Sequence, residues 1–247
     1  MLRVLEPLWT RRPETAGRVR GRIESVLDWA AARGYRQGEN PARWRGHLDK
    51  LLPARSKIAP VRHYPALPYR DLPAFMSELR ANGSISALAL EMAILTASRT
   101  GEIIGATWPE VDLETRVWTV PASRMKSGRT HRVPLCDRCV AILVNLPRIV
   151  GCEYLFPGGR PGKPLSNMAL LELMRGMRPG FVPHGFRSTF KDWATETTDH
   201  ARDIVEAALA HVIGDKVEAA YRRGDALEKR RTLMVDWALY CGSPTRA

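Results

Sequence analysis

The chain has 247 residues, 45% of them hydrophobic, which is enough to bury a sizeable core in one or two domains. Its 38 Lys and Arg against 26 Asp and Glu give a formal net charge of +12, which favours a polyanionic partner over an acidic small molecule. Four cysteines are too few for a disulfide scaffold and no apolar run can span a bilayer, so we exclude these two classes and expect a cytoplasmic protein.

The first quarter of the chain is its most basic part. Residues 1–64 contain 14 basic and 6 acidic side chains, so they carry +8 of the net charge. Apolar residues recur at helical spacing over residues 19–30 and predict an amphipathic helix. Its polar faces carry Arg18, Arg20 and Arg22, which could contact DNA phosphates or form an ordinary solvated face.

A proline-rich segment follows. Four prolines stand between residues 53 and 68, and because proline fixes φ and lacks an N–H donor, they predict an interdomain linker. The basic residues between them could follow a DNA backbone, although a solvated linker would look the same: Arg55, Lys57, Arg62 and His63. We therefore expect a helical segment at 1–60, a linker to about residue 68 and a larger domain at 69–247.

The larger domain is predicted to be mainly helical with a small antiparallel sheet, an α+β fold. The apolar run over residues 85–97 predicts a buried helix that ends just before Arg99. Short strands are then predicted at 111–120 and 131–135, on either side of a turn at Lys126–Arg129. Six further helices are predicted at residues 137–146, 167–177, 185–198, 202–210, 215–223 and 226–240.

Two cysteines of this domain form a lone CxxC pair, Cys136 and Cys139. Cys152 and His131 are conceivable further zinc ligands, but a second pair at a regular spacing is missing. The alternative is that the two thiols are simply buried or stand at the start of a helix.

Two arginines follow patterns that suit a phosphate. Arg99 comes directly after the buried helix, and Glu102 one turn later could orient its guanidinium, although this ion pair alone would also explain the arginine. His184 and Arg187 are three residues apart near a helix start and share one face. This HxxR pattern is weak on its own, but two arginines from separate helices could clamp one phosphate through bidentate hydrogen bonds.

Three more residues complete the candidate site. Lys126, beside Arg129 on the predicted turn, could reach into a groove, although solvated turn lysines are commoner. His211 precedes Tyr221 by ten residues. Most tyrosines are core or rim residues, but basic neighbours surround Tyr221, and its phenol could hold a phosphate covalently once deprotonated.

Five motifs resemble, in identity and order, the catalytic boxes of the tyrosine recombinases, most closely those of prophage and genomic-island integrases. They are Thr96-Ala-Ser-Arg99-Thr-Gly-Glu102, Lys126 on a hairpin, His184-Gly-Phe-Arg187, Leu209-Ala-His211 and Ala220-Tyr221-Arg222. The resemblance covers residues 65–247 well. Residues 1–64 resemble the end of the family's helical core-binding domain, so we expect the chain to begin inside that module.

The resemblance implies site-specific cleavage and rejoining of DNA without metal, ATP or another cofactor. Tyr221 would be the nucleophile that forms a 3′-phosphotyrosyl link and frees a 5′-hydroxyl. Arg99 and Arg187 would neutralise the pentacoordinate phosphate. Among the remaining residues, Lys126 would protonate the leaving oxygen, His211 would donate to a phosphate oxygen and His184 would handle the tyrosine proton.

The implied partners are double-stranded DNA, further copies of the chain in a DNA-bound homo-tetramer assembled from monomers, and accessory DNA-bending proteins. The resemblance leaves the C-terminal stretch at 227–237 with two alternatives, docking on a neighbouring protomer or packing on its own domain. Two other functions stay open: DNA relaxation like that of a type IB topoisomerase, and DNA binding without catalysis by a truncated integrase remnant.

Overall fold

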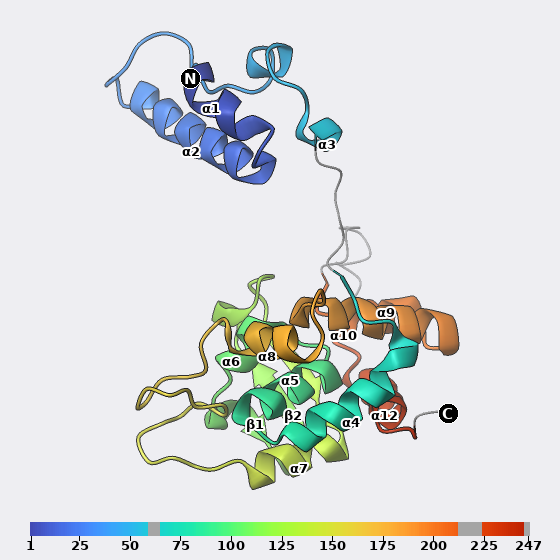
Figure 1. The fold of residues 1–247 in the computed structure, drawn as a ribbon. Coiled ribbons are helices and arrows are strands. Elements are labelled where there is room, and N and C mark those ends of the chain that lie inside the picture. The colour runs from blue at the N-terminus through green and yellow to red at the C-terminus, as the bar shows by residue number, and fades with distance from the viewer. Residues whose placement is uncertain (59–64, 212–223, 245–247) are drawn as a thin grey trace. The chain divides into compact units, whose positions relative to one another are not determined.

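The computed structural model describes residues 1–58, 65–211 and 224–244 (Figure 1). The chain forms two compact units, Met1–His63 and Tyr64–Ala247, and their boundary lies in the proline-rich segment. Over the described ranges, no helix is both long enough and apolar enough to cross a membrane.

The first unit is a small helical module. It contains α1 (Leu2–Trp9), α2 (Pro13–Ala32), a short 3-10 helix (Leu48–Lys50) and α3 (Arg55–Ile58). The helix predicted over residues 19–30 is therefore confirmed as part of α2, which begins on a proline, a residue whose fixed φ suits a first helical position. Its core is formed by five buried side chains: Leu5, Trp9, Ala16, Leu48 and Leu52.

The apolar face predicted for α2 is only partly covered. Ala16 is the buried residue of this helix, whereas Val26 and Trp29 are 64% and 56% exposed. The periodicity was thus sufficient to predict the helix, but the covering of its apolar face depends on tertiary packing that periodicity does not encode.

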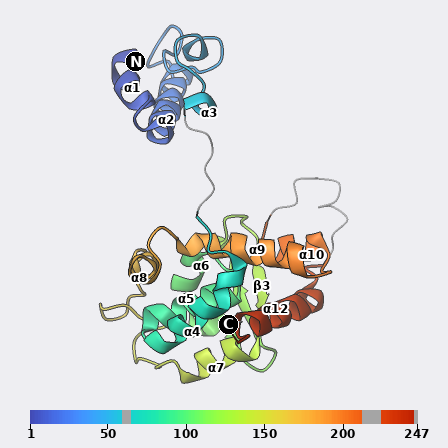
Figure 2. The ribbon, with the colours of Figure 1, turned by 45° about the vertical axis from the view of Figure 1, so that its right-hand side comes forward.

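The second unit is mainly helical, as predicted. Its helices are α4 (Leu72–Asn82), α5 (Ile85–Leu95), α6 (Thr100–Ile104), α7 (Asp137–Asn145), α8 (Ala169–Met177), α9 (Phe186–Thr197), α10 (Arg202–Ala208) and α12 (Leu227–Cys241). The central helix is α5, which is almost wholly buried and packs against α4, α6, α7, α8, α9 and α12 (Figure 2). The helix predicted at 215–223 lies outside the described residues.

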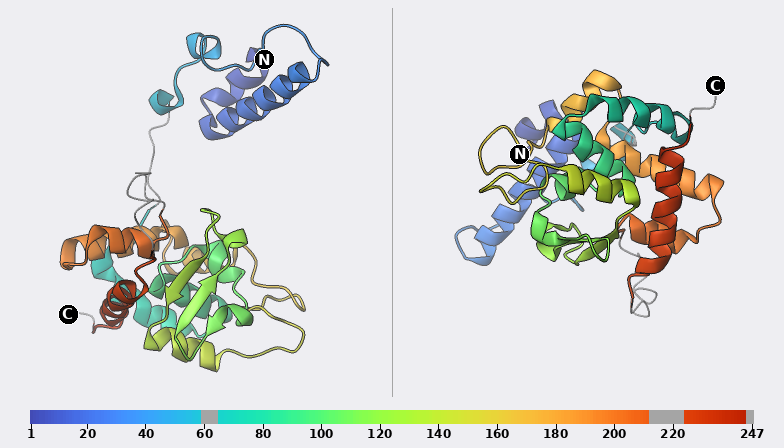
Figure 3. Two further views of the ribbon diagram at one scale, coloured as in Figure 1. Left: turned by 180° about the vertical axis from the view of Figure 1, so that it is seen from behind. Right: turned by 90° about the horizontal axis from the view of Figure 1, so that it is seen from below.

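A three-stranded antiparallel sheet covers one side of these helices (Figure 3, left). Its order is β1 (Val111–Asp112), β2 (Val117–Val120), β3 (His131–Pro134). The single strand predicted over 111–120 is thus two strands, because a turn separates them in which Arg116 has a positive φ of 54°. Val120 pairs with His131, so the Lys126 turn connects β2 and β3.

The C-terminal helix α12 packs on its own unit, against α4, α5, α10 and β3 (Figure 3, right). Leu233, Met234 and Trp237 are buried, and the Trp237 indole N–H donates to the Ile94 carbonyl of α5 over 2.8 Å. Residues 227–237 thus pack on their own unit, which is the second of the two alternatives. Further aromatic rings surround Trp237, so this contact anchors α12 to the core.

Candidate functional site

Arg99 is fixed by the carboxylate that the sequence suggested. It precedes α6 as the N-cap residue, where its backbone N–H donates to Oε2 of Glu102 over 2.9 Å. Its guanidinium Nη1 donates to Oε1 of the same residue over 2.7 Å. Glu102 is only 4% exposed. One buried carboxylate therefore orients both the backbone and the guanidinium of Arg99.

Arg187, on α9, is the most buried cation of the site, with 6% exposure. Its guanidinium donates to two backbone carbonyls. Nη1 donates to Ala97, in the turn before Arg99, and Nη2 donates to Leu209, after α10, over 2.5 Å. Burial, together with the positive charge of Arg99, lowers the pKa of Arg187 to about 10. Two like charges are therefore held close together at the junction of three segments.

His211 continues this arrangement at the end of α10. Its Nε2 lies 3.3 Å from Nη2 of Arg187, and its Nδ1 lies 2.5 Å from Oε2 of Glu206. The second oxygen of Glu206 pairs with Nζ of Lys191 over 2.6 Å. Because arginine can only donate, Nε2 acts as the acceptor in this geometry and Nδ1–H donates to Glu206. The carboxylate of Glu206 thus orients the imidazole.

His184 lies in the 3-10 helix Pro183–Gly185, immediately before α9. Burial lowers its pKa, and the charges of Arg187 and Arg99 lower it further. The imidazole is therefore held neutral beside the two arginines. The structure brings together four residues predicted from the sequence: Arg99, Arg187, His184 and His211.

A fifth residue of this region, His131 on β3, was considered in the sequence only as a zinc ligand. Burial lowers its pKa to about 4, helped by the charges of Arg230, Arg187 and Arg99. The strand pattern could have placed it inward, since His131 and the buried Val133 share one face of β3. His131 is thus a candidate site residue that the motif analysis missed.

Lys126 is exposed on the turn between β2 and β3, next to the exposed Arg129. It makes no hydrogen bond or ion pair with the residues that the structure describes, so its approach to the arginines stays a prediction. Tyr221 and Arg62 lie outside the described residues, and their roles also stay predictions.

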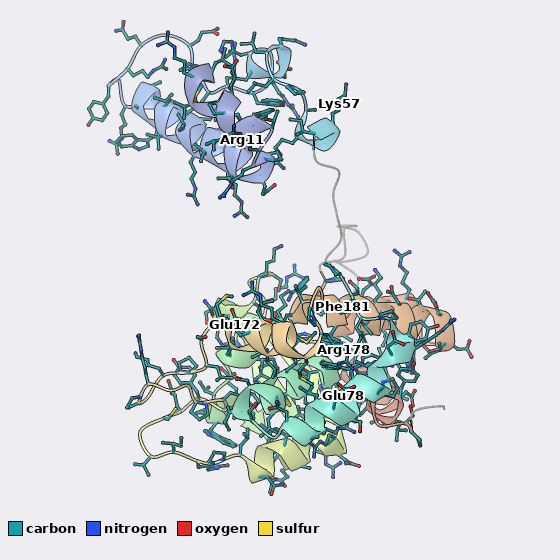
Figure 4. The ribbon with its side chains drawn as sticks, in the orientation of Figure 1. Arg11, Lys57, Glu78, Glu172, Arg178 and Phe181 are labelled. Carbon is teal, nitrogen blue, oxygen red and sulfur yellow. The ribbon has the colours of Figure 1, made fainter. Side chains whose placement is uncertain are left out.

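The basic residues of the first unit differ in what they contact. Arg20 is only 17% exposed in its side chain and bonds Glu24 over 2.6 Å and the Ala42 carbonyl over 2.8 Å, which favours a structural role. By contrast, Arg22 and Lys57 are exposed (Figure 4 labels Lys57 on α3). The remaining two, Arg18 and Arg55, share the exposed carboxylate of Glu14.

The CxxC pair stands at the start of α7. Cys136 is its N-cap residue, and the sulfurs of Cys136 and Cys139 are 3.4 Å apart. Among the described residues no three His, Cys, Asp or Glu side chains are grouped as a metal site, so Cys152 and His131 do not complete one with this pair. The geometry is that of helix-start thiols, the alternative to zinc.

Comparisons with known proteins match both units. The phage integrase family model matches residues 66–228, and the phage integrase central domain model matches residues 1–47. Prophage integrase IntA of Escherichia coli (strain K12) is 32% identical over 245 residues, covering 96% of this chain and 57% of that protein. The integrase of Shigella phage Sf6 is 33% identical over 235 residues, covering 91% and 58%. The chain thus spans a little over half the length of these relatives.

Solved structures show the same fold. The integrase from mycobacterium phage Brujita superimposes with a TM-score of 0.55 at 21% identity, covering 93% of this chain and 75% of that one. A lambda integrase chain, from a tetramer bound to a Holliday junction, gives a TM-score of 0.61 at 16% identity, covering 86% and 63%. The mainly helical α+β fold predicted from the sequence is confirmed.

Proposed function

Since this chain belongs to the phage integrase family of tyrosine recombinases, we propose that it cleaves and rejoins double-stranded DNA at a specific site through Tyr221. The family match supports the reaction class, and the first unit would serve as part of the core-binding domain that grips DNA. On DNA the chain would act as a homo-tetramer, with accessory DNA-bending proteins as further partners.

The observation that carries this proposal is the shared electrostatics of the site. The pKa values of Arg187, His184 and His131 are all lowered, first by burial and then by neighbouring positive charge that includes Arg99. Such a group of cations and donors is destabilised without an anion, and a phosphodiester would relieve the repulsion. Two carboxylates, Glu102 and Glu206, offset part of this positive charge, and the pKa of Arg187 is still lowered, which leaves room for the charge of a phosphate.

The proposed reaction is an in-line displacement at phosphorus. The Tyr221 oxygen bonds to phosphorus, the bond to the 5′-oxygen breaks, and Lys126 protonates that oxygen. His184 accepts the tyrosine proton, for which its neutral form is required, and the lowered pKa keeps it neutral. Arg99 and Arg187 would donate to the non-bridging oxygens, each being worth roughly 3–4 kcal/mol, by analogy with an oxyanion-hole donor.

Rejoining reverses these steps. A 5′-hydroxyl attacks the phosphotyrosine, which has conserved the energy of the broken linkage, so no nucleotide hydrolysis is required. His211, oriented by Glu206, would donate to a phosphate oxygen in both directions once its Nε2 has taken up a proton and given up the hydrogen bond that it accepts from Arg187.

The test is a covalent-trapping experiment. Nicked duplexes with a randomised central sequence lose a short fragment after cleavage, so the phosphotyrosyl adduct accumulates and migrates slowly on a denaturing gel. We expect an adduct with the wild-type chain and with the control Tyr35→Phe, whose tyrosine is 75% exposed in the first unit. Tyr221→Phe should give none, and an unchanged adduct in this variant would refute the proposal.

Plasmid-relaxation and DNA-binding assays separate the other two functions. Relaxation of supercoiled plasmid by a monomer without sequence preference would indicate topoisomerase-like activity. Salt-sensitive DNA binding with no adduct on any sequence would indicate a non-catalytic remnant.

A further inference from the structure

The CxxC pair at the start of α7 is a chemical group that strand cleavage does not use. Cys136 lies at the N-cap and Cys139 lies one turn into the helix, with their sulfurs 3.4 Å apart. A disulfide requires about 2.0 Å between the sulfurs, so a small side-chain rotation would suffice to form one. Between them in sequence, Arg138 is bonded to the buried Glu91 of α5 by 2.7 and 2.9 Å contacts, which fixes the first turn of α7.

The two thiols are chemically unequal. Hydrogen bonds with Cys139 and with backbone N–H groups at the helix start lower the pKa of Cys136 to about 7, although burial by itself would raise it. The same contact and burial raise the pKa of Cys139. Near neutral pH, Cys136 is therefore substantially a thiolate nucleophile, while Cys139 holds a proton. This is the asymmetry of an attacking and a resolving cysteine.

Cys136 also borders a pocket of about 330 Å³. Three arginines line this pocket, Arg116, Arg138 and Arg231, together with one acidic residue, Asp137. Its apolar wall comes from the residue after β3 and from α12: Leu135, Val235, Ala238 and Leu239. The lining is therefore amphipathic with an excess of positive charge, next to a nucleophilic sulfur.

Each of these arginines has a carboxylate neighbour: Asp137 for Arg116, Glu91 for Arg138 and Glu228 for Arg231. The pairs of Arg116 and Arg231 involve exposed carboxylates, and exposed ion pairs contribute little net energy. The carboxylates of a ligand can therefore replace Asp137 and Glu228 at low cost in free energy, whereas Arg138 stays paired with Glu91.

We propose that Cys136 and Cys139 are a redox-active dithiol that exchanges with an anionic low-molecular-weight disulfide bound in this pocket. The Cys136 thiolate attacks one sulfur of the ligand, which breaks the ligand's S–S bond, forms a mixed disulfide and releases one thiolate. Cys139 then attacks the Cys136 sulfur and forms the intramolecular disulfide, and its proton goes to the second released thiol. The protein dithiol is oxidised by two electrons and the ligand disulfide is reduced to two thiols.

The first test uses the intact chain incubated with oxidised glutathione as the anionic probe, followed by mass spectrometry and peptide mapping. We expect the wild type to lose two hydrogens with a link between residues 136 and 139. Cys139→Ser should trap glutathione on Cys136, and the control Cys152→Ser should behave as the wild type. A pair that stays reduced, or glutathione found on Cys152 while Cys136 is unmodified, would overturn the proposal.

The second test addresses the pocket. At low salt, oxidised glutathione should react with the wild type about tenfold faster than the cationic disulfide cystamine does. The double variant Arg116→Gln, Arg231→Gln should lose this electrostatic preference. Equal rates in the wild type would rule out an anionic ligand.

A third measurement needs no variant. Alkylation of wild-type Cys136 by iodoacetamide should rise with pH around a midpoint near 7, with Cys139 unreactive in the same samples. A Cys136 rate that rises only at the pH of an ordinary thiol would contradict its nucleophilic role.

Discussion

Arg187 differs from Arg99 in what it holds together. Its buried guanidinium joins the turn before Arg99 to the segment after α10 through two backbone carbonyls. Arg99 instead depends on Glu102. The carboxylate of Glu102 also accepts a hydrogen bond from the backbone N–H of residue 99, and this bond does not depend on which side chain residue 99 carries. One arginine is therefore structural as well as catalytic in the proposed site, and the other is mainly catalytic.

A pair of lysine substitutions separates these roles. Arg187→Lys cannot reach both carbonyls and leaves one buried and unbonded, so it should lower the free energy of unfolding by about 2 kcal/mol. Arg99→Lys keeps the charge beside Glu102 and should cost less than half of that. Both should slow adduct formation by roughly 10²-fold, since lysine loses the bidentate contact with phosphate. Equal losses of stability in denaturant titrations would contradict the structural role of Arg187.

His131 makes the stability of the second unit depend on pH. Its folded pKa, about 4, lies below the ordinary value of roughly 6.5, so the unfolded chain binds the proton more tightly. Its contribution is complete above pH ~6.5 and is lost as pH falls towards 4, on the order of 2 kcal/mol by pH ~5.

Thermal unfolding of His131→Gln tests this sign. The variant should lose less stability than the wild type between pH 7 and 5, and a smaller dependence of the same sign should remain because the pKa of His184 is also lowered. A variant whose melting temperature falls as steeply as that of the wild type would show that His131 is not held neutral.

At the scale of elements, local patterns predicted most of the second unit. The apolar run at 85–97, the helix starts and the Lys126 turn were all readable because helix and strand periods are properties of neighbouring residues. What the sequence left open depends on distant contacts. The burial of α12 follows from its fit against α5, and the inward position of His131 follows from the pairing of β3 with β2.

The same limit applies to the candidate site. Arg99, His184, Arg187 and His211 were predicted from motifs, and the structure brings them together. The structural role of Arg20 was not predictable, because two of its three partners, the Ala42 carbonyl and the Trp44 ring, come from a loop more than twenty residues away. Tyr221, outside the described residues, keeps the role that its motif predicts.

Helix α12 should be an integral part of the second unit. Trp237→Phe removes the hydrogen bond to the Ile94 carbonyl and part of a buried ring, so it should lower the free energy of unfolding by roughly 2–4 kcal/mol. The control Leu239→Ala, on the same helix but 69% exposed, should change it by less than about 0.5 kcal/mol. Equal effects of the two substitutions in thermal melts would show that α12 is not anchored by its buried face.

For the whole molecule, the uneven charge is the property that bears on DNA. The first unit holds most of the excess positive charge, but its arginines are not equivalent. Arg22 and Lys57 are exposed and make no ion pair with other described residues, whereas Arg20 is tied to Glu24. Only free cations release counterions from DNA when they bind it, so net charge alone overestimates the number of phosphate contacts.

The salt dependence of DNA binding distinguishes these two groups. If Arg22 and Lys57 each neutralise one phosphate, Arg22→Gln with Lys57→Gln should reduce the slope of log K against log salt by about 1.8, since each contact contributes about 0.9. Arg20→Gln should leave the slope unchanged but lower the melting temperature of the first unit, because it breaks the contacts with Glu24 and Ala42.

Fluorescence anisotropy with a labelled duplex between about 50 and 200 mM salt measures the slopes. A double variant with the wild-type slope would mean that these two side chains are only a solvated face, and the grip on DNA would then have to come from the second unit.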